Sequence, residues 1–91
     1  MAALVTRSLF SPAYGRLREL LVAARRSRRL TQADLAATLG RPQSYVSKYE
    51  RGERRLDVVE LVEIASALQL DARDLVGEVC RVQATPRSGA Q

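Results

Sequence analysis

Side chains that usually carry catalysis are nearly missing from this 91-residue sequence, which has no histidine and a single cysteine, Cys80. A structural zinc site normally takes four Cys or His ligands, and the common nucleophile triads need an imidazole. Neither can be assembled here, and the five glycines are scattered without a phosphate-binding loop. We therefore expect no enzymatic activity, no metal and no cofactor.

A second kind of chemistry is present in four polar residues that lie within one short segment: Gln43, Ser44, Ser47 and Lys48. Their spacing places them on one face of a helix. Gln can form two hydrogen bonds with adenine, Lys can donate to guanine oxygens, and Ser can donate to a base or a phosphate. We interpret the four as base-contacting. The alternative for each is an ordinary solvated helix surface.

The charge distribution supports a polyanionic partner. The chain is long enough for one small domain, and 46% hydrophobic residues are enough for a folded core. The net charge is +5, but residues 1–56 carry +8 and residues 57–91 carry −3. A basic half attracts nucleic acid, because phosphate contacts release counterions. Alternatively, fourteen arginines against one lysine reflect only genomic base composition.

The two ends of the sequence differ from its centre. We interpret residues 1–10 as a flexible arm and residues 80–91 as a disordered tail, which leaves a domain over 11–79. Organelle import through residues 1–18, which hold no acid, is the alternative for the first segment. No apolar run approaches the length of a membrane span. The single cysteine favours a reducing compartment, and we expect a cytoplasmic protein.

Helix signals follow one another between these ends. The expected helices run from Ser11 to about Ser27, Thr31 to Gly40, Pro42 to Gly52, Asp57 to Leu68, and, as a short fifth helix, from Asp71. Ser, Thr or Asp caps an N-terminus, and Gly permits a left-handed stop. The apolar stripe of the fourth helix comprises Val58, Leu61, Ile64, Ala65 and Leu68. The sequence therefore predicts an all-α fold of five helices, with the second and third crossing steeply.

Three groups of residues carry a family resemblance: Leu30 to Ala36, Gly40 to Gly52, and the apolar positions Leu61, Ile64, Ala65, Ala67, Leu68 and Leu70. Together they resemble the lambda-repressor-like, XRE-type transcription regulators. This resemblance covers residues 14–77. It implies a compact DNA-binding domain with the helix-turn-helix at the second and third helices. It also implies that Gln32 holds a backbone phosphate and that Arg25 and Glu50 form a structural ion pair. Pro42 departs from the family, which usually has a small hydroxyl residue there.

Further contacts are expected around this motif. Four arginines on the flanking loops would contact phosphates: Arg41, Arg51, Arg54 and Arg55. One helix contacts few base pairs, so specific binding calls for a homodimer on a palindromic site. We expect its interface on the fifth helix, at Leu75, Val76 and Val79.

These observations favour a sequence-specific transcriptional regulator that binds double-stranded DNA, most simply a repressor. One alternative is an antitoxin or interaction module that holds a protein partner, such as a toxin or co-regulator, and binds DNA secondarily. Another is an adaptor that binds no DNA. Substitution of Gln43 and Lys48 by Ala would separate the DNA-binding interpretation from the adaptor. Co-purification of a second small protein would favour the antitoxin or interaction module.

Overall fold

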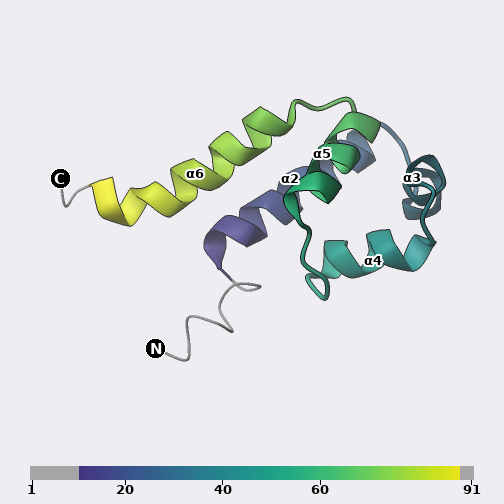
Figure 1. Ribbon diagram of the computed structural model, residues 1–91, viewed down its shortest axis with the longest axis horizontal. Helices are drawn as coiled ribbons and strands as arrows, with labels where there is room; N and C mark the ends of the chain where they lie inside the picture. Colours follow the sequence, from purple (N-terminus) through teal and green to yellow (C-terminus); the bar gives the residue numbers. More distant parts are fainter. Residues whose placement is uncertain (1–10, 89–91) are drawn as a thin grey trace.

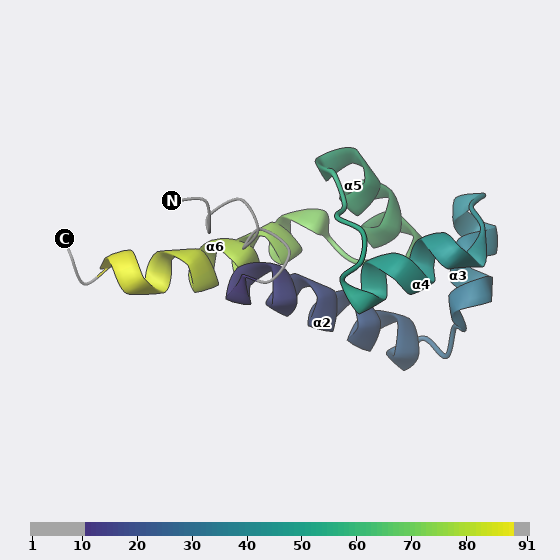
Figure 2. The same ribbon diagram turned by 90° about the horizontal axis from the view of Figure 1, so that it is seen from below.

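The computed structural model describes residues 11–88, with their side chains as far as Gln83. These residues form five helices and no strand: α2 (Pro12–Ser27), α3 (Gln32–Leu39), α4 (Gln43–Arg51), α5 (Val58–Ala67) and α6 (Ala72–Ser88). α6 packs along α2 and runs in the opposite direction, and its C-terminal part extends past the beginning of α2 (Figures 1 and 2). The predicted all-α fold is confirmed. The arm predicted for residues 1–10 and the last three residues of the predicted tail lie outside the described residues.

The helices begin at the predicted caps. The Ser11 hydroxyl caps α2. Thr31 accepts a hydrogen bond from the Asp34 amide at 3.0 Å, and the Asp34 carboxylate accepts one from the Thr31 amide at 2.9 Å. Asp57 and Glu60 form the same reciprocal box at the start of α5, at 2.7 and 3.0 Å. Each box satisfies two amides that a helix N-terminus leaves unpaired, which fixes where α3 and α5 start.

Three residues join α3 to α4 and set their steep crossing. Gly40 ends α3 in the left-handed region, at φ 68°, which glycine adopts without steric strain. Pro42 precedes the first residue of α4 and, as its chemistry predicts, offers no side-chain cap. Ala36 is buried in this helix-turn-helix, where a larger side chain would separate the two helices.

The hydrophobic core lies on the inner side of α4. Val46 and Tyr49 of α4 are completely buried, together with Leu21 of α2, Leu35 of α3 and Ile64 of α5. Both side chains therefore anchor α4 to the rest of the domain. Because the apolar residues of α4 all point inward, its opposite face is left polar and exposed.

Two predictions about helices are wrong. The fifth helix is not short, because α6 has 17 residues and takes in residues 80–88 of the predicted tail. Leu75 is buried and Val79 packs against the core, so contact with α2 stabilises a helix that has few local signals of its own. Val58 does not belong to the buried stripe of α5, since it is 75% exposed in the first turn.

Candidate nucleic-acid interface

A buried ion pair joins α2 to the end of α4. Arg25 Nε donates to Glu50 Oε2 at 2.7 Å, and Arg25 Nη2 donates to Oε1 at 3.0 Å. A third donor of the same guanidinium reaches the Leu30 carbonyl at 2.8 Å. The hydrogen bond with Glu50 raises the pKa of Arg25. The structure thus places Arg25 and Glu50 together as the family resemblance implies, in a two-bond arrangement that fixes both side chains.

The same glutamate orients two glutamines. Gln32 Nε2, at the start of α3, donates to Glu50 Oε1 at 2.9 Å, and Gln43 Nε2, at the start of α4, donates to Gln32 Oε1 at 3.3 Å. A chain of hydrogen bonds therefore runs from the buried Arg25 to the exposed Gln43. It holds the first residues of both motif helices in a fixed relation to each other.

The remaining residues predicted to contact bases lie on the outer face of α4. Ser44 and Lys48 are exposed, and the half-buried Ser47 accepts a hydrogen bond from Arg51 Nη1 at 2.6 Å. This face is opposite Val46. It therefore presents amide, hydroxyl and ammonium groups together, the donor types that contact base edges.

Arg41 and Arg54 both lie over the ring of one tyrosine. Their guanidinium carbons are 4.5 and 4.8 Å from the ring centroid of Tyr45. Both arginines also pair with Glu60, Arg54 at 2.8 Å and Arg41 at 3.7 Å. Hydrogen bonds from Arg54 and then from the Asp57 amide lower the pKa of Glu60 to about 2. Both cations are thus fixed and partly neutralised, so a phosphate would share or displace Glu60.

Arg51 and Arg55 have other partners. Arg51 forms a two-bond ion pair with Glu53, at 2.9 and 3.0 Å. Arg55 is exposed, and its guanidinium lies 5.4 Å from the ring centroid of Tyr14. Arg51 is the last residue of α4, and the other three predicted phosphate-contacting arginines flank this helix. Of the four, only Arg55 has no ion pair with a carboxylate among the described residues.

The loop between α4 and α5 is held by a residue that the sequence analysis did not select. The Tyr14 hydroxyl donates to the Arg54 carbonyl at 3.4 Å and accepts from the Leu56 amide at 3.1 Å. Tyr14 is buried and comes from the first turn of α2, some forty residues earlier. No local signal indicated its bond to the loop.

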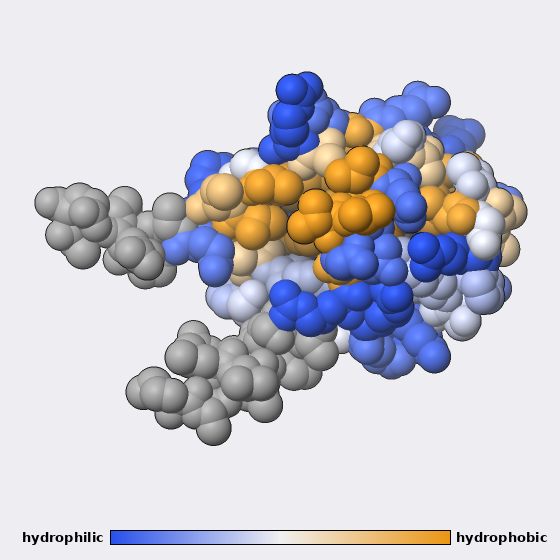
Figure 3. Space-filling model, viewed as in Figure 1, coloured by the Kyte–Doolittle hydropathy of each residue, from blue (hydrophilic) through white to orange (hydrophobic). Residues whose placement is uncertain are grey.

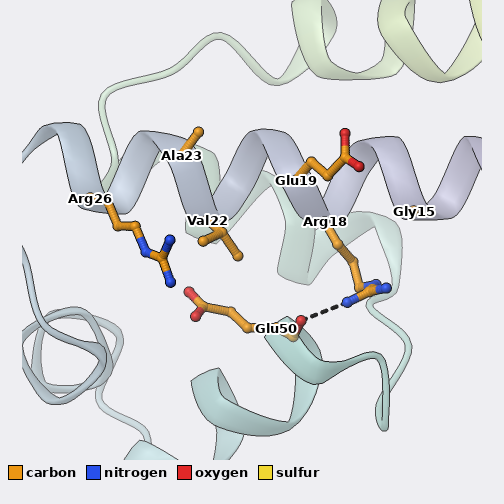
Figure 4. A pocket seen from close by; sticks show the side chains of 7 residues that line it. All are labelled: Gly15, Arg18, Glu19, Val22, Ala23, Arg26 and Glu50. Atoms are coloured by element: carbon orange, nitrogen blue, oxygen red, sulfur yellow. Dashed lines mark hydrogen bonds between the residues drawn. The ribbon is translucent and has the colours of Figure 1, made fainter.

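A groove between α2 and the end of α4 is shown in Figure 4. It has a volume of about 380 Å³ and includes Arg18, Arg26 and Glu50 in its lining. Arg18 donates to the Glu50 carbonyl at 2.7 Å, which satisfies a carbonyl at the negative end of α4. Gly52, at φ 83°, lets Arg18 lie close, because a Cβ there would be 3.2 Å from its guanidinium carbon. On the α4 side of the groove, Arg18 is therefore held by Glu50 and Gly52 and joins α2 to the end of α4.

The residues predicted for a dimer interface are not all on the surface. Leu75 is 5% exposed and belongs to the core, while Val79 is half-buried against it. Val76 is 47% exposed. Of the three, only Val76 is available to a partner without unpacking the domain.

Within residues 11–88 there is no group of three or more carboxylate, cysteine or histidine residues placed to hold a metal ion. No helix in the same part of the chain has the length and hydrophobicity needed to cross a membrane.

Known proteins are similar to this chain in sequence and in fold. The sequence model of a helix-turn-helix family, HTH_3, matches residues 21–75. The chain is 42% identical over 52 residues to the uncharacterized HTH-type transcriptional regulator y4dJ of Sinorhizobium fredii, across 57% of this chain and 68% of that protein. The solved structure of an XRE-family like protein from Pseudomonas syringae pv. tomato is 41% identical, with a TM-score of 0.73, over 82% of this chain and 92% of that one. The chain therefore belongs to the XRE-type helix-turn-helix family of DNA-binding transcriptional regulators.

Proposed function

We propose that the chain is a sequence-specific repressor in the bacterial cytoplasm and binds a near-palindromic operator as a homodimer. α4 enters the major groove, and four side chains contact bases: Gln43, Ser44, Ser47 and Lys48. The observation that carries this proposal is the hydrogen-bond chain from Arg25 through Glu50 and Gln32 to Gln43. It fixes an exposed polar side chain in advance, which lowers the entropic cost of base contact.

Phosphate contacts surround this helix in the proposal. Gln32 lies at the N-terminus of α3, where the helix dipole favours an anion. Arg55 contacts a phosphate directly, while Arg41, Arg51 and Arg54 do so after sharing or losing their carboxylate partners. Each neutralised phosphate contributes about −0.9 to the slope of the logarithm of the binding constant against the logarithm of the salt concentration. This slope therefore measures how many of these arginines contact phosphates.

Selection of bound sequences from a random DNA pool at two salt concentrations tests the proposal. The wild type should yield a palindromic consensus with half-sites about 34 Å apart. The double variant Gln43→Ala, Lys48→Ala should lose it, with about 1–3 kcal/mol lost per good base contact. The control variant Arg16→Ala, Gln83→Ala removes the same number of charges and amides from α2 and α6 and should keep the consensus.

Other outcomes contradict parts of the proposal. A consensus without symmetry excludes the palindromic homodimer. Salt-dependent binding without any consensus, equal in all variants, excludes sequence-specific repression and favours an antitoxin-like module. In that case a co-purifying small protein is the expected partner. A reporter gene placed behind the selected site tests the sign of regulation. If its expression rises with the amount of the protein, repression is excluded, while the proposed DNA binding is unaffected.

A further inference from the structure

The first half of α5 exposes its valines and covers a glutamate. Val58, Val59 and Val62 are 75%, 66% and 50% exposed, and in Figure 3 the hydrophobic colour lies over α5. The Glu60 side chain, in contrast, is only 12% exposed. Covering a carboxylate is unfavourable unless it gains charged or hydrogen-bonding partners. The position of Glu60 therefore depends on the groups that surround it.

Two arginines from different loops meet at one oxygen of this carboxylate. Arg54 Nη2 lies 2.8 Å and Arg41 Nη1 lies 3.7 Å from Glu60 Oε2, and Arg54 Nη1 also donates to Oε1 at 3.0 Å. Arg41 belongs to the turn between α3 and α4, and Arg54 to the loop between α4 and α5. Both guanidiniums lie over the ring of Tyr45, which is part of α4. The segments that flank α4 on either side thus meet at a single anionic oxygen.

The geometry of this contact is that of a phosphate site. A guanidinium donates paired N–H bonds to a carboxylate as it does to a phosphate, since both present two anionic oxygens. The side chains of Arg41 and Arg54 are 36% and 38% exposed, which leaves both accessible from solvent. Arg41 is within ion-pair distance of Glu60 but beyond hydrogen-bond distance, so it can turn a donor to a second acceptor. Glu60 Oε2 therefore lies where one phosphate oxygen would contact both arginines.

The charges of this cluster balance one another. Glu63 adds a second carboxylate, 3.6 Å from Arg41 Nη2. Two guanidiniums are thus paired with two carboxylates. Hydrogen bonds from Arg54 lower the pKa of Glu60 to about 2, which keeps this carboxylate ionised at neutral pH. A balanced cluster attracts a phosphate less than two unpaired arginines would.

The start of α5 does not need the charge of Glu60. Glu60 Oε1 accepts a hydrogen bond from the Asp57 amide at 3.0 Å, which completes the capping box. A glutamine at this position can make the same bond with its amide oxygen. The negative charge therefore acts mainly on the two arginines.

We propose that Glu60 is an affinity-determining residue of the DNA interface, which competes with a DNA phosphate for Arg41 and Arg54. This proposal rests on the proposed function and deepens it, because it makes the two arginines one phosphate site with a resident competitor. DNA binding then exchanges one anionic acceptor for another. Phosphate contacts carry no sequence information, so the competition lowers the affinity for every duplex by about the same factor and leaves the base preference to α4.

Glu60→Gln tests the competition, because glutamine keeps the cap on the Asp57 amide and removes only the charge. Glu78→Gln is the matched control. Glu78 is also half-buried and paired with two arginines, Arg16 and Arg81, but it lies on α6, which packs mainly on α2. Titrations of a consensus duplex and a scrambled duplex over a range of salt concentrations, well below the Tm of each variant, measure the affinity.

We expect Glu60→Gln to bind both duplexes about three- to fivefold more tightly than Glu78→Gln, the range for an ion pair at a protein surface. Its salt slope should be steeper by about 0.9, because the cluster brings one further positive charge to the phosphates. The base preference should be unchanged. In a background with Arg41→Ala and Arg54→Ala, Glu60→Gln should have no more effect than Glu78→Gln. This last comparison separates competition for the arginines from a general effect of charge or stability.

Three results would overturn the proposal. One is equal binding by Glu60→Gln and Glu78→Gln. Another is weaker binding by Glu60→Gln, which would show that Glu60 positions the arginines for DNA. The third is a gain in affinity that persists without Arg41 and Arg54. Each of these results leaves a sequence-specific wild type, and hence the proposed function, in place.

A wild type that binds no DNA would refute the proposed function, and inorganic phosphate then tests the site by itself. The Nε–H resonances of Arg41 and Arg54 in NMR spectra should shift at a lower phosphate concentration in Glu60→Gln than in Glu78→Gln. This result would support the competition without the proposed function. Equal phosphate concentrations in the two variants would overturn the competition as well.

Discussion

Replacing Arg25 by methionine should strongly destabilise the domain. Methionine keeps much of the length and apolar contact of the arginine but removes three hydrogen-bond donors, two of them to Glu50. The Glu50 side chain is only 6% exposed. Its carboxylate would then be a buried charge whose remaining side-chain donor is Gln32, at 2.9 Å.

The expected magnitude follows from this loss. Removing one partner of a buried ion pair costs about 3–5 kcal/mol, because the other charge stays desolvated. In a domain of this size each kcal/mol lowers Tm by about 4–8 °C, so Tm should fall by at least about 12 °C. Replacing both partners, as Arg25→Met with Glu50→Leu, should recover most of the stability, because an apolar pair leaves no buried charge.

DNA binding should respond differently from stability. Without the Glu50 carboxylate, Gln32 loses its acceptor and Gln43 loses its indirect link to the core. The double variant should therefore fold almost as stably as the wild type but bind its consensus about tenfold more weakly, at a temperature well below its Tm. Single variants would confuse these two effects because part of the protein would be unfolded.

Urea and thermal unfolding followed by far-ultraviolet circular dichroism suits this chain, which has no tryptophan. Titration of a labelled consensus duplex gives the affinity. A loss below about 1 kcal/mol for Arg25→Met would refute the argument that Glu50 is left unpaired and buried. A double variant as unstable as the single one would refute it as well, and one with full DNA affinity would refute the positioning of Gln43 through Glu50.

Three further predictions concern single groups. Tyr49 is completely buried, burial raises its pKa, and its hydroxyl has no hydrogen-bond partner among the described residues. Tyr49→Phe should therefore leave the free energy of unfolding unchanged or raise it by up to about 1 kcal/mol. A clear loss of stability in urea unfolding would show that the hydroxyl is paired. Tyr14→Phe should release the loop at Arg54 and Leu56, because it removes both hydrogen bonds of the tyrosine hydroxyl. The expected cost is about 1 kcal/mol in stability, with weaker DNA binding and an unchanged consensus. Hydrogen exchange of the Leu56 amide should be faster in the variant, and equal exchange rates would contradict the role of Tyr14 in holding the loop. Glu60 has its pKa lowered from 4.5 to about 2, so its carboxylate contributes stability that is complete above about pH 4.5 and is lost as the pH falls toward 2. Glu60→Gln should therefore be less stable than the wild type at pH 7, and this difference should shrink between pH 4.5 and 2; a difference that is constant with pH would contradict the assigned ion pair.

Local signals predicted most of the fold. The cap at Ser11, the box at Thr31 and Asp34, and the left-handed stop at Gly40 each involve groups within four residues of one another. Their geometry is set by the backbone of a single turn and needs no distant contact. The outward face of α4 followed in the same way from the helical spacing of Gln43, Ser44, Ser47 and Lys48.

Predictions that needed distant contacts were less successful. The length of α6 was missed because α2, more than forty residues earlier, covers its apolar side. Val58 was assigned to a buried stripe because periodicity shows which residues share a face, whereas only neighbouring elements show where that face ends. The family resemblance, rather than spacing, supplied the pairing of Arg25 with Glu50.

The candidate site divides in the same way. The sequence by itself determined which side chains α4 presents outward and that basic residues flank it, because helical periodicity and composition are local properties. Only the tertiary structure decided what holds them. It placed Glu50 beside Gln32, and Glu60 beside Arg41 and Arg54. Hydrogen bonds and ion pairs depend on distances between separate helices, and these distances are set by how the whole core packs.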